Sequence, residues 1–326
     1  MMHAVRGQKA FDWSLVILVN FMWATQVPVI RLIGDRLGPV TVAFVPMIVS
    51  ALIFLPLLWR ENKKRNVKMR WRWKDIKYFV LPGLIGIFIM QYAYTVGSRL
   101  TLAANAGIIT LTIPVIVAMF ASWMLKEKMN IIRILSFILA IAGVLLTSLS
   151  DVSEADFAHS GFLAGNLIFL FACFCCGYYN TCCKLLVNKS FTELEILVYS
   201  SLIGSVASLP LLIWVEPFHF DQFVNSGKLA LMGMLELSVI VYGVSSLLFF
   251  YILKRMDVTQ AILGNYLLPF FIALMGVLLL SEKITPVMAI GGALILVSTL
   301  MVTVYEPFLL SLFKQKNVRE PGQAAE

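Results

Sequence analysis

One acidic residue lies inside a long apolar stretch. Glu236 is about seven residues into the run LALMGMLELSVIVYGV, which puts its carboxyl about 10 Å from the end of that run if it is helical. Ionisable groups at such depth are energetically unfavourable and are functional candidates. Because a carboxyl away from water is more easily kept neutral, Glu236 could take up and release a proton. An ionised Glu236 could instead hold an ammonium group. The alternative to both roles is that Glu236 lies near the membrane interface and is structural.

Polar and aromatic side chains in other apolar runs could line a cavity together with this acid. Gln91 and Tyr94 are three residues apart and therefore share one face of a helix. A pocket of aromatic and amide groups suits a moderately polar or amphiphilic solute, although each group alone could equally join two helices. The candidate binding residues are Trp23, Gln26, Gln91, Tyr94, Asn105, Tyr178, Asn180, Tyr242, Asn265 and Tyr266.

Two prolines, Pro114 and Pro269, lie inside long apolar runs that resemble each other. A proline inside a helix removes one backbone hydrogen bond and crowds the preceding turn. A membrane helix tolerates this where neighbours or a cavity satisfy the freed carbonyl. We therefore expect Pro114 and Pro269 to act as a matched pair of hinges, with packing geometry alone as the alternative.

Each of these two runs ends in a Glu–Lys pair that contains Glu127 or Glu282. A helix-capping residue follows each pair, Asn130 in the first and Thr285 in the second, and Pro286 takes a favoured first-turn position. This pattern predicts that both carboxylates lie at a membrane interface and orient tight turns. We do not expect them to be catalytic.

The elements that hold these residues are predicted from composition. Of the 326 residues, 60% are hydrophobic and 13% are charged, whereas a soluble chain is about half apolar and about a quarter charged. Runs of about 20 apolar residues span a bilayer as helices, so we expect an all-α integral membrane protein with ten transmembrane helices. The runs lie at about 13–31, 39–59, 78–98, 102–125, 131–149, 160–183, 194–214, 229–253, 258–280 and 286–305.

Basic residues in the links predict the orientation. Nine of them lie between Arg60 and Lys77, after the second run, and Lys and Arg are in excess on the cytoplasmic side of membrane proteins. The link after the seventh run, VEPFHFDQFVNSGK, contains a single basic residue. We therefore expect a multi-pass protein of the cell membrane with both termini in the cytoplasm. The basic loop could also contact anionic lipid headgroups.

The chain contains the same passage twice. The offset is 282 − 127 = 155 for the glutamates and 269 − 114 = 155 for the prolines. Ten spans with this offset form two sets of five, and because five is odd the second set must cross the membrane upside down. Inverted repeats of this kind are an architecture of secondary transporters, with the substrate site near the midplane between the copies.

Three segments carry a resemblance to a known family: FMWATQVPVIR, NAGIITLTIPVIVAMFASWMLKEK and QAILGNYLLPFFIALMGVLLLSEK. With them, the sequence from about residue 13 to 305 resembles the EamA-type permeases of the drug/metabolite transporter superfamily. The resemblance implies two five-helix repeats and the movement of small metabolites, often amino acids or related compounds, by alternating access without ATP. The chain departs from the family pattern twice. Its second run reads VAFVPMIVS, without the Arg that members often have there, and its sixth run lacks the usual Trp.

Several other classes of function are disfavoured by the sequence. All five cysteines fall in CFCCGYYNTCC, a cluster typical of small packing residues in a membrane helix rather than of a metal site or a disulfide framework. No Walker-type G-x-x-x-x-G-K-[ST] motif is present, and no soluble domain presents the basic loop to nucleic acid. The first run is longer than the apolar core of a signal peptide. We expect no enzyme activity and no cofactor.

The sequence therefore predicts a first five-helix repeat at 1–150, a second inverted repeat at 151–306 and a cytoplasmic tail at 307–326. Its predicted function is secondary active or facilitative transport of a small organic metabolite, with membrane lipids as its surroundings. Proton coupling through Glu236 is one possibility and electroneutral facilitation is another. The competing prediction is a lipid scramblase or flippase, which a lateral opening with apolar walls would favour.

Overall fold

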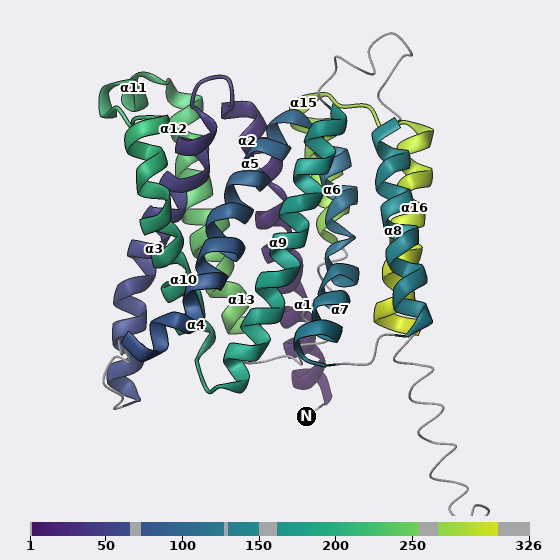
Figure 1. The fold of residues 1–326 in the computed structure, drawn as a ribbon, viewed down its shortest axis with the longest axis horizontal. Coiled ribbons are helices and arrows are strands. Elements are labelled where there is room, and N and C mark those ends of the chain that lie inside the picture. Colours follow the sequence, from purple (N-terminus) through teal and green to yellow (C-terminus); the bar gives the residue numbers. More distant parts are fainter. Residues whose placement is uncertain (1, 66–72, 127–129, 150–161, 254–266, 306–326) are drawn as a thin grey trace, which may run out of the picture.

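The computed structural model describes residues 2–65, 73–126, 130–149, 162–253 and 267–305. Over these ranges the chain is a bundle of helices that run side by side (Figure 1). Eight of these helices are long and apolar enough to cross a membrane. Two further apolar helices, Ile131–Thr147 and Leu268–Leu280, are shorter. The prediction of an all-helical, multi-pass membrane protein is confirmed.

The spans are assembled from α-helical and π-helical segments. The α-helices are α1 (Met2–Ala24), α2 (Gln26–Ile33), α3 (Pro39–Lys64), α4 (Trp73–Gly83), α5 (Met90–Leu100), α6 (Ala103–Thr110), α7 (Ile113–Met124), α8 (Ile131–Leu149), α9 (Phe162–Asn188), α10 (Glu193–Pro210), α11 (Phe220–Asn225), α12 (Lys228–Leu235), α13 (Ser245–Leu253), α15 (Leu268–Leu280) and α16 (Pro286–Leu300). The π-helical segments are η1 (Leu84–Ile89), η2 (Leu211–Val215), η3 (Glu236–Val244) and η5 (Met301–Tyr305).

The bundle has two ends, which we name from Figure 1. The upper face is the end where α2 ends and α3 begins, and the lower face is the end from which α1 starts. Short helix α11 lies at the upper face, beside the start of α12. The helices α8 and α16 lie together at one side of the bundle and run in opposite directions.

The first span is broken at Thr25, which separates α1 from α2. Pro28 explains the break, because it has no N–H to donate to the carbonyl four residues earlier, that of Ala24. The fourth span is broken in the same way. Its lower part, α7, begins at Ile113 with Pro114 in the first turn, so the proline starts a helix instead of lying inside one.

One carbonyl group at the break in the fourth span has a partner on another helix. The Leu111 carbonyl accepts a hydrogen bond of 2.5 Å from Thr299 Oγ1 on α16, as expected where backbone polar groups have no access to water. Pro269 likewise lies in the first turn of α15, after the capping residue Leu267. Both prolines therefore lie in the first turn of a helix, and Pro114 does so in the middle of the span Ala103–Met124, a position that suits a hinge.

Two π-helical segments fall within the spans Asp75–Leu100 and Lys228–Phe249. Segment η1 continues α4 into α5, and η3 continues α12 into α13. The sequence analysis did not predict them. A π-helical turn widens a helix and is frequent at functional sites, and η3 contains both Glu236 and Tyr242.

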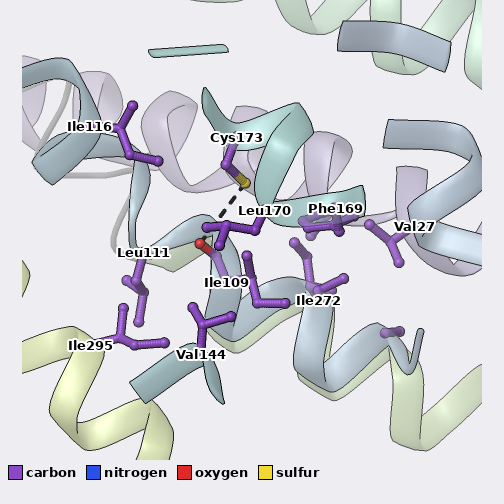
Figure 2. Packing of buried hydrophobic residues seen from close by; sticks show 13 residues of the cluster. Val27, Ile109, Leu111, Ile116, Val144, Phe169, Leu170, Cys173, Ile272 and Ile295 are labelled. Atoms are coloured by element: carbon purple, nitrogen blue, oxygen red, sulfur yellow. Dashed lines mark hydrogen bonds between the residues drawn. The ribbon is translucent and has the colours of Figure 1, made fainter. Parts of the chain in front are cut away.

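A large buried cluster packs between the two halves of the chain. In Figure 2, Ile109 of α6, Cys173 of α9 and Ile272 of α15 point toward one another, and Ile295 of α16 lies close by. The Cys173 thiol lies 3.9 Å from the Ile109 carbonyl oxygen, as a weak donor. Since lipid is as apolar as these side chains, close packing rather than exclusion from water holds such a cluster together.

Helices α8 and α16 pack closely because glycines let their backbones approach. A Cβ atom added at Gly291 would lie 2.5 Å from Thr147 Cγ2 and 2.8 Å from the Gly143 carbonyl oxygen. Small residues at a contact are the usual means of close helix packing in membranes. The neighbouring Gly292 has more room, since its added Cβ would meet only the Ile108 side chain, at 3.3 Å or more.

These neighbours allow a matched test of the α8–α16 contact. Gly291→Ala should lower the free energy of unfolding in detergent by about 1–3 kcal/mol, because the backbones must separate. Gly292→Ala should have little effect, because the Ile108 side chain can move by a few tenths of an ångström. Thermal unfolding of the two purified variants measures the difference. Equal unfolding midpoints would contradict the close contact.

Candidate functional site

Three predicted binding residues are joined by hydrogen bonds in the middle of the bundle. Gln26 Nε2 donates to the Tyr242 hydroxyl oxygen at 2.7 Å, and Gln91 Nε2 donates to the same oxygen. The three side chains come from α2, α5 and η3. Neither bond uses the hydroxyl proton of Tyr242, which remains able to donate.

Aromatic side chains flank this hydrogen-bonded group. Tyr94 packs against the Phe169 ring, with centroids 4.7 Å apart, and Trp23 packs against the Phe249 ring at 5.1 Å. Trp23, Tyr94 and Tyr242 all contact one buried cluster of α2, α3, α12 and η3 side chains. The group therefore combines amide and hydroxyl groups with neighbouring aromatic rings, and its role in binding stays a prediction.

Glu236 contacts the break in the first span. Its Oε1 is hydrogen-bonded to Thr25 Oγ1, and the same Thr25 oxygen lies 2.7 Å from the Met22 carbonyl oxygen. Thr25 is the one residue between α1 and α2. Sequence analysis missed Thr25, although a threonine three residues before Pro28 could have indicated a break with a free hydroxyl nearby.

The geometry at Thr25 links two protonation states of Glu236 to two hydrogen-bond patterns. A hydroxyl group has one proton to donate, so Thr25 cannot donate to both Met22 and Glu236. When Glu236 is neutral, it can donate to Thr25 while Thr25 donates to the Met22 carbonyl. When Glu236 is ionised, Thr25 must donate to it, and the Met22 carbonyl loses that bond. A proton on Glu236 thus changes the bonding at the helix break.

The second oxygen of Glu236 is available to a ligand or proton. Glu236 Oε2 is buried and has no hydrogen-bond partner among the residues that the structure describes. The ion pair found among the described residues joins Arg31 to Glu282 and does not involve Glu236. A buried carboxyl without a cationic partner is unfavourable when ionised, so this site favours a proton or a positively charged ligand.

The remaining candidate residues lie in other regions of the bundle or outside the residues that the structure describes. Asn105 is fully buried on α6. Tyr178 and Asn180 lie on the lower half of α9, where the Tyr178 ring packs edge-on against Phe120 and Asn180 Nδ2 contacts Cys176 Sγ at 3.6 Å. The residues Asn265, Tyr266 and Glu127 lie outside the described residues.

At the upper face, Glu216 caps a helix that belongs to the first half of the chain. Its carboxylate accepts hydrogen bonds from the N–H groups of Val40 at 2.9 Å and Thr41 at 2.8 Å. These are the first N–H groups of α3, which its own capping residue, Gly38, cannot satisfy with a side chain. A Cβ at Gly38 would lie 2.2 Å from this carboxylate, so a larger residue there would displace Glu216 from the helix start.

Glu282 makes a second contact of the same kind. It accepts hydrogen bonds from the N–H groups of Ala103 at 2.8 Å and Ala104 at 3.0 Å, at the start of α6. It also pairs with Arg31, at the end of the first span. Glu282 is buried, so the expectation of an interfacial carboxylate that merely orients a turn is incomplete. The capping role of Thr285 is confirmed, since its hydroxyl accepts from Met288 N at 3.2 Å.

Comparison with known proteins identifies the family. The model of the EamA-like transporter family matches the chain twice, at residues 13–149 and 163–304. The chain belongs to the EamA-like transporter family. The resemblance drawn from the three sequence segments is therefore confirmed, and the two matches cover most of the chain.

Two of three similar proteins are named as transporters. A protein of Streptantibioticus cattleyicolor, named as a probable terminal-alkyne amino-acid exporter, is 25% identical over 86% of this chain and 89% of its own length. An uncharacterized transporter of Archaeoglobus fulgidus is 20% identical over 89% of this chain and 98% of its own. A chloroplastic WAT1-related protein of Arabidopsis thaliana is 24% identical over 91% of this chain and 70% of its own.

A solved crystal structure has the same fold. It is 18% identical to this EamA-like chain, covers 91% of it and 99% of its own chain, and superposes with a TM-score of 0.55. The match supports the helix arrangement alone.

The hydrogen bonds to Tyr242 can be tested by their effect on stability. Tyr242→Phe should lower the free energy of unfolding by about 1–3 kcal/mol, because the amides of Gln26 and Gln91 lose their shared acceptor away from water. Tyr92→Phe is the control, because the Tyr92 ring stacks on Phe44 and the substitution keeps that contact. Unfolding in increasing SDS measures both variants. A Tyr242→Phe protein as stable as Tyr92→Phe would contradict the bonded cluster.

Proposed function

We propose that this EamA-like protein is a secondary transporter that moves a small organic metabolite, such as an amino acid or a related compound, by alternating access. The observation that carries the proposal is the polar cluster of Gln26, Gln91 and Tyr242, with Glu236 bonded to Thr25 nearby. Its members come from both halves of the chain and lie at a helix break and a π-helical segment. A site built in this way can change shape when the halves move.

The chemistry of the site supports an amino-acid-like substrate. Glu236 can hold an ammonium group, and the amide and hydroxyl groups can bind a carboxylate, an amide or a hydroxyl of the substrate. The aromatic rings of Trp23 and Tyr94 provide contact area for an apolar part. The name of the Streptantibioticus cattleyicolor relative, an amino-acid exporter, agrees with this substrate class.

We also propose that ten spans form two inverted five-helix repeats, at 1–150 and 151–306. Three observations support this architecture. The family model matches twice, at 13–149 and 163–304. The proposed fifth and tenth spans, α8 and α16, run in opposite directions (Figure 1), and the prolines 155 residues apart both lie in the first turn of a helix.

The lower face is proposed to be cytoplasmic. The basic stretch from Arg60 to Lys77 includes the end of α3 and the start of α4, which lie at that face, and positive charge marks the cytoplasmic side. Both termini, including the tail 307–326, are then in the cytoplasm. A reporter fused after Lys77 should be cytoplasmic and one fused after Ser153 should be external, as alkaline phosphatase and green fluorescent protein fusions would measure. Any other pattern would overturn this orientation.

Glu236 is the proposed proton-coupling residue. Glu236→Gln should abolish uptake driven by a pH gradient in proteoliposomes, because an amide cannot release a proton. Counterflow exchange of the same substrate should continue, because exchange needs no net proton movement. Gradient-driven uptake that is unchanged in Glu236→Gln would remove Glu236 from the coupling mechanism and leave facilitated transport.

The lipid scramblase alternative has weaker support. An apolar surface cavity of about 490 Å³ lies at the lower end of the tenth span, where an acyl chain would fit. Its lining is aliphatic apart from one tyrosine, whereas a scramblase path must also carry a polar headgroup. The lining residues are Val297, Leu300, Met301, Val304 and Tyr305.

A further inference from the structure

Two carboxylates from the second half of the chain hold two helices of the first half at the upper face. Glu216 accepts both of its hydrogen bonds from the start of α3, and Glu282 accepts two from the start of α6 while pairing with Arg31. We call these two sets of contacts the upper clasp. Neither α3 nor α6 has a capping side chain of its own, since the residue before each is Gly38 or Leu102.

The start of α10 is capped from within its own half of the chain. The Thr192 hydroxyl at the start of α10 accepts from Glu195 N at 3.1 Å, and the Glu195 carboxylate accepts from Thr192 N at 2.8 Å. This cap lies at the lower face, where α9 leads into α10. Capping a helix start therefore does not require a partner from the other half, so the two partners at the upper face need a separate explanation.

The upper clasp lies above the polar cluster. Arg31 is five residues above Gln26 on α2, which is about 7 Å along the helix. Thr101, next to the start of α6, is ten residues above Gln91 along α5, which is about 15 Å. A solute that moves between the upper face and Tyr242 must therefore pass the level of these contacts.

We propose that the upper clasp is the gate on the upper side of the transport path, and that opening it separates Glu216 from α3 and Glu282 from α6. The inference rests on the proposed function, because a gate needs a path to close. When the clasp opens, water can replace the partners of the four N–H groups and of Arg31, since the clasp lies at the end of the bundle. The closed and open states can therefore be close in free energy, as alternating access requires.

The charges within the upper clasp make it sensitive to single substitutions. Each carboxylate uses both oxygens to accept hydrogen bonds, and hydrogen bonds to a charged group are stronger than neutral ones. A glutamine has only one acceptor oxygen and would place its NH₂ against a backbone N–H. Glu216→Gln and Glu282→Gln should therefore each shift the closed-to-open ratio about tenfold toward the open state.

Distances between spin labels test the gate without any substrate. The background is the full-length protein with its five cysteines replaced by serine, reconstituted in lipid. One label pair, at Asp35 and Gln222, brackets the Glu216 contact, and a second pair, at Leu100 and Ile284, brackets the Glu282 contact. All four positions are exposed. The control is Thr192→Val, which removes a helix cap at the lower face and within one half.

The expected result is a longer distance population in Glu216→Gln and in Glu282→Gln, and a wild-type distribution in Thr192→Val. Wild-type distances in both glutamine variants would overturn the gate, as would an equal change in Thr192→Val, which would indicate general loosening. Glu282→Gln also breaks the ion pair with Arg31 and could fail to fold. In that case Glu216→Gln decides alone, because Glu216 is not part of the ion pair. If the distances contradict the gate, the proposed function is still tested separately by the transport and pH-gradient experiments, since these measure different steps.

Discussion

The structure depends on one constraint: inside a bilayer, backbone N–H and C=O groups must find their partners within the protein. Every departure from a continuous helix therefore needs a specific polar neighbour. The Leu111 carbonyl at the break in the fourth span has the Thr299 hydroxyl. At the upper face, where water could also reach them, the helix starts of α3 and α6 are bonded to the carboxylates of Glu216 and Glu282. These partners come from the other half of the chain, so the hydrogen bonds that satisfy the backbone groups also join the two halves.

The breaks are also where polar side chains collect. Pro28 interrupts the first span and leaves Thr25 between two helices, where its hydroxyl reaches both a backbone carbonyl and Glu236. One hydroxyl proton cannot satisfy both acceptors, so protonation of Glu236 changes how the break is bonded. Gln26, the next residue along the chain, donates to Tyr242. The helix break, the acid and the proposed binding residues thus form one connected region, in which a proton or a ligand can bias the arrangement of the helices.

Much of this organisation can be predicted from the sequence, for identifiable reasons. The apolar runs predicted an all-helical membrane protein, and the proline–glutamate repeat helped to predict the family, because run length and the offset of 155 residues can be read directly from the sequence. The contact of Gln26, Gln91 and Tyr242 was predicted only as a set of candidates, since polar side chains on three spans do not indicate which ones face each other. Thr25, Glu216 and the pairing of Arg31 with Glu282 were missed as partners because they depend on which helix ends meet in space. The π-helical segments left no signal in the periodicity of such uniformly apolar runs.

The central claim is that the polar cluster lies between two halves that expose it to each side of the membrane in turn. The most direct test places a single cysteine at position 26, in a protein without its native cysteines, and measures its reaction with a membrane-impermeant thiol reagent. Vesicles of the two opposite orientations supply access from either side. Our account predicts that the cysteine reacts from both sides, and that an occluding substrate slows both reactions. Reaction from one side only, or from neither, would contradict alternating access at this site.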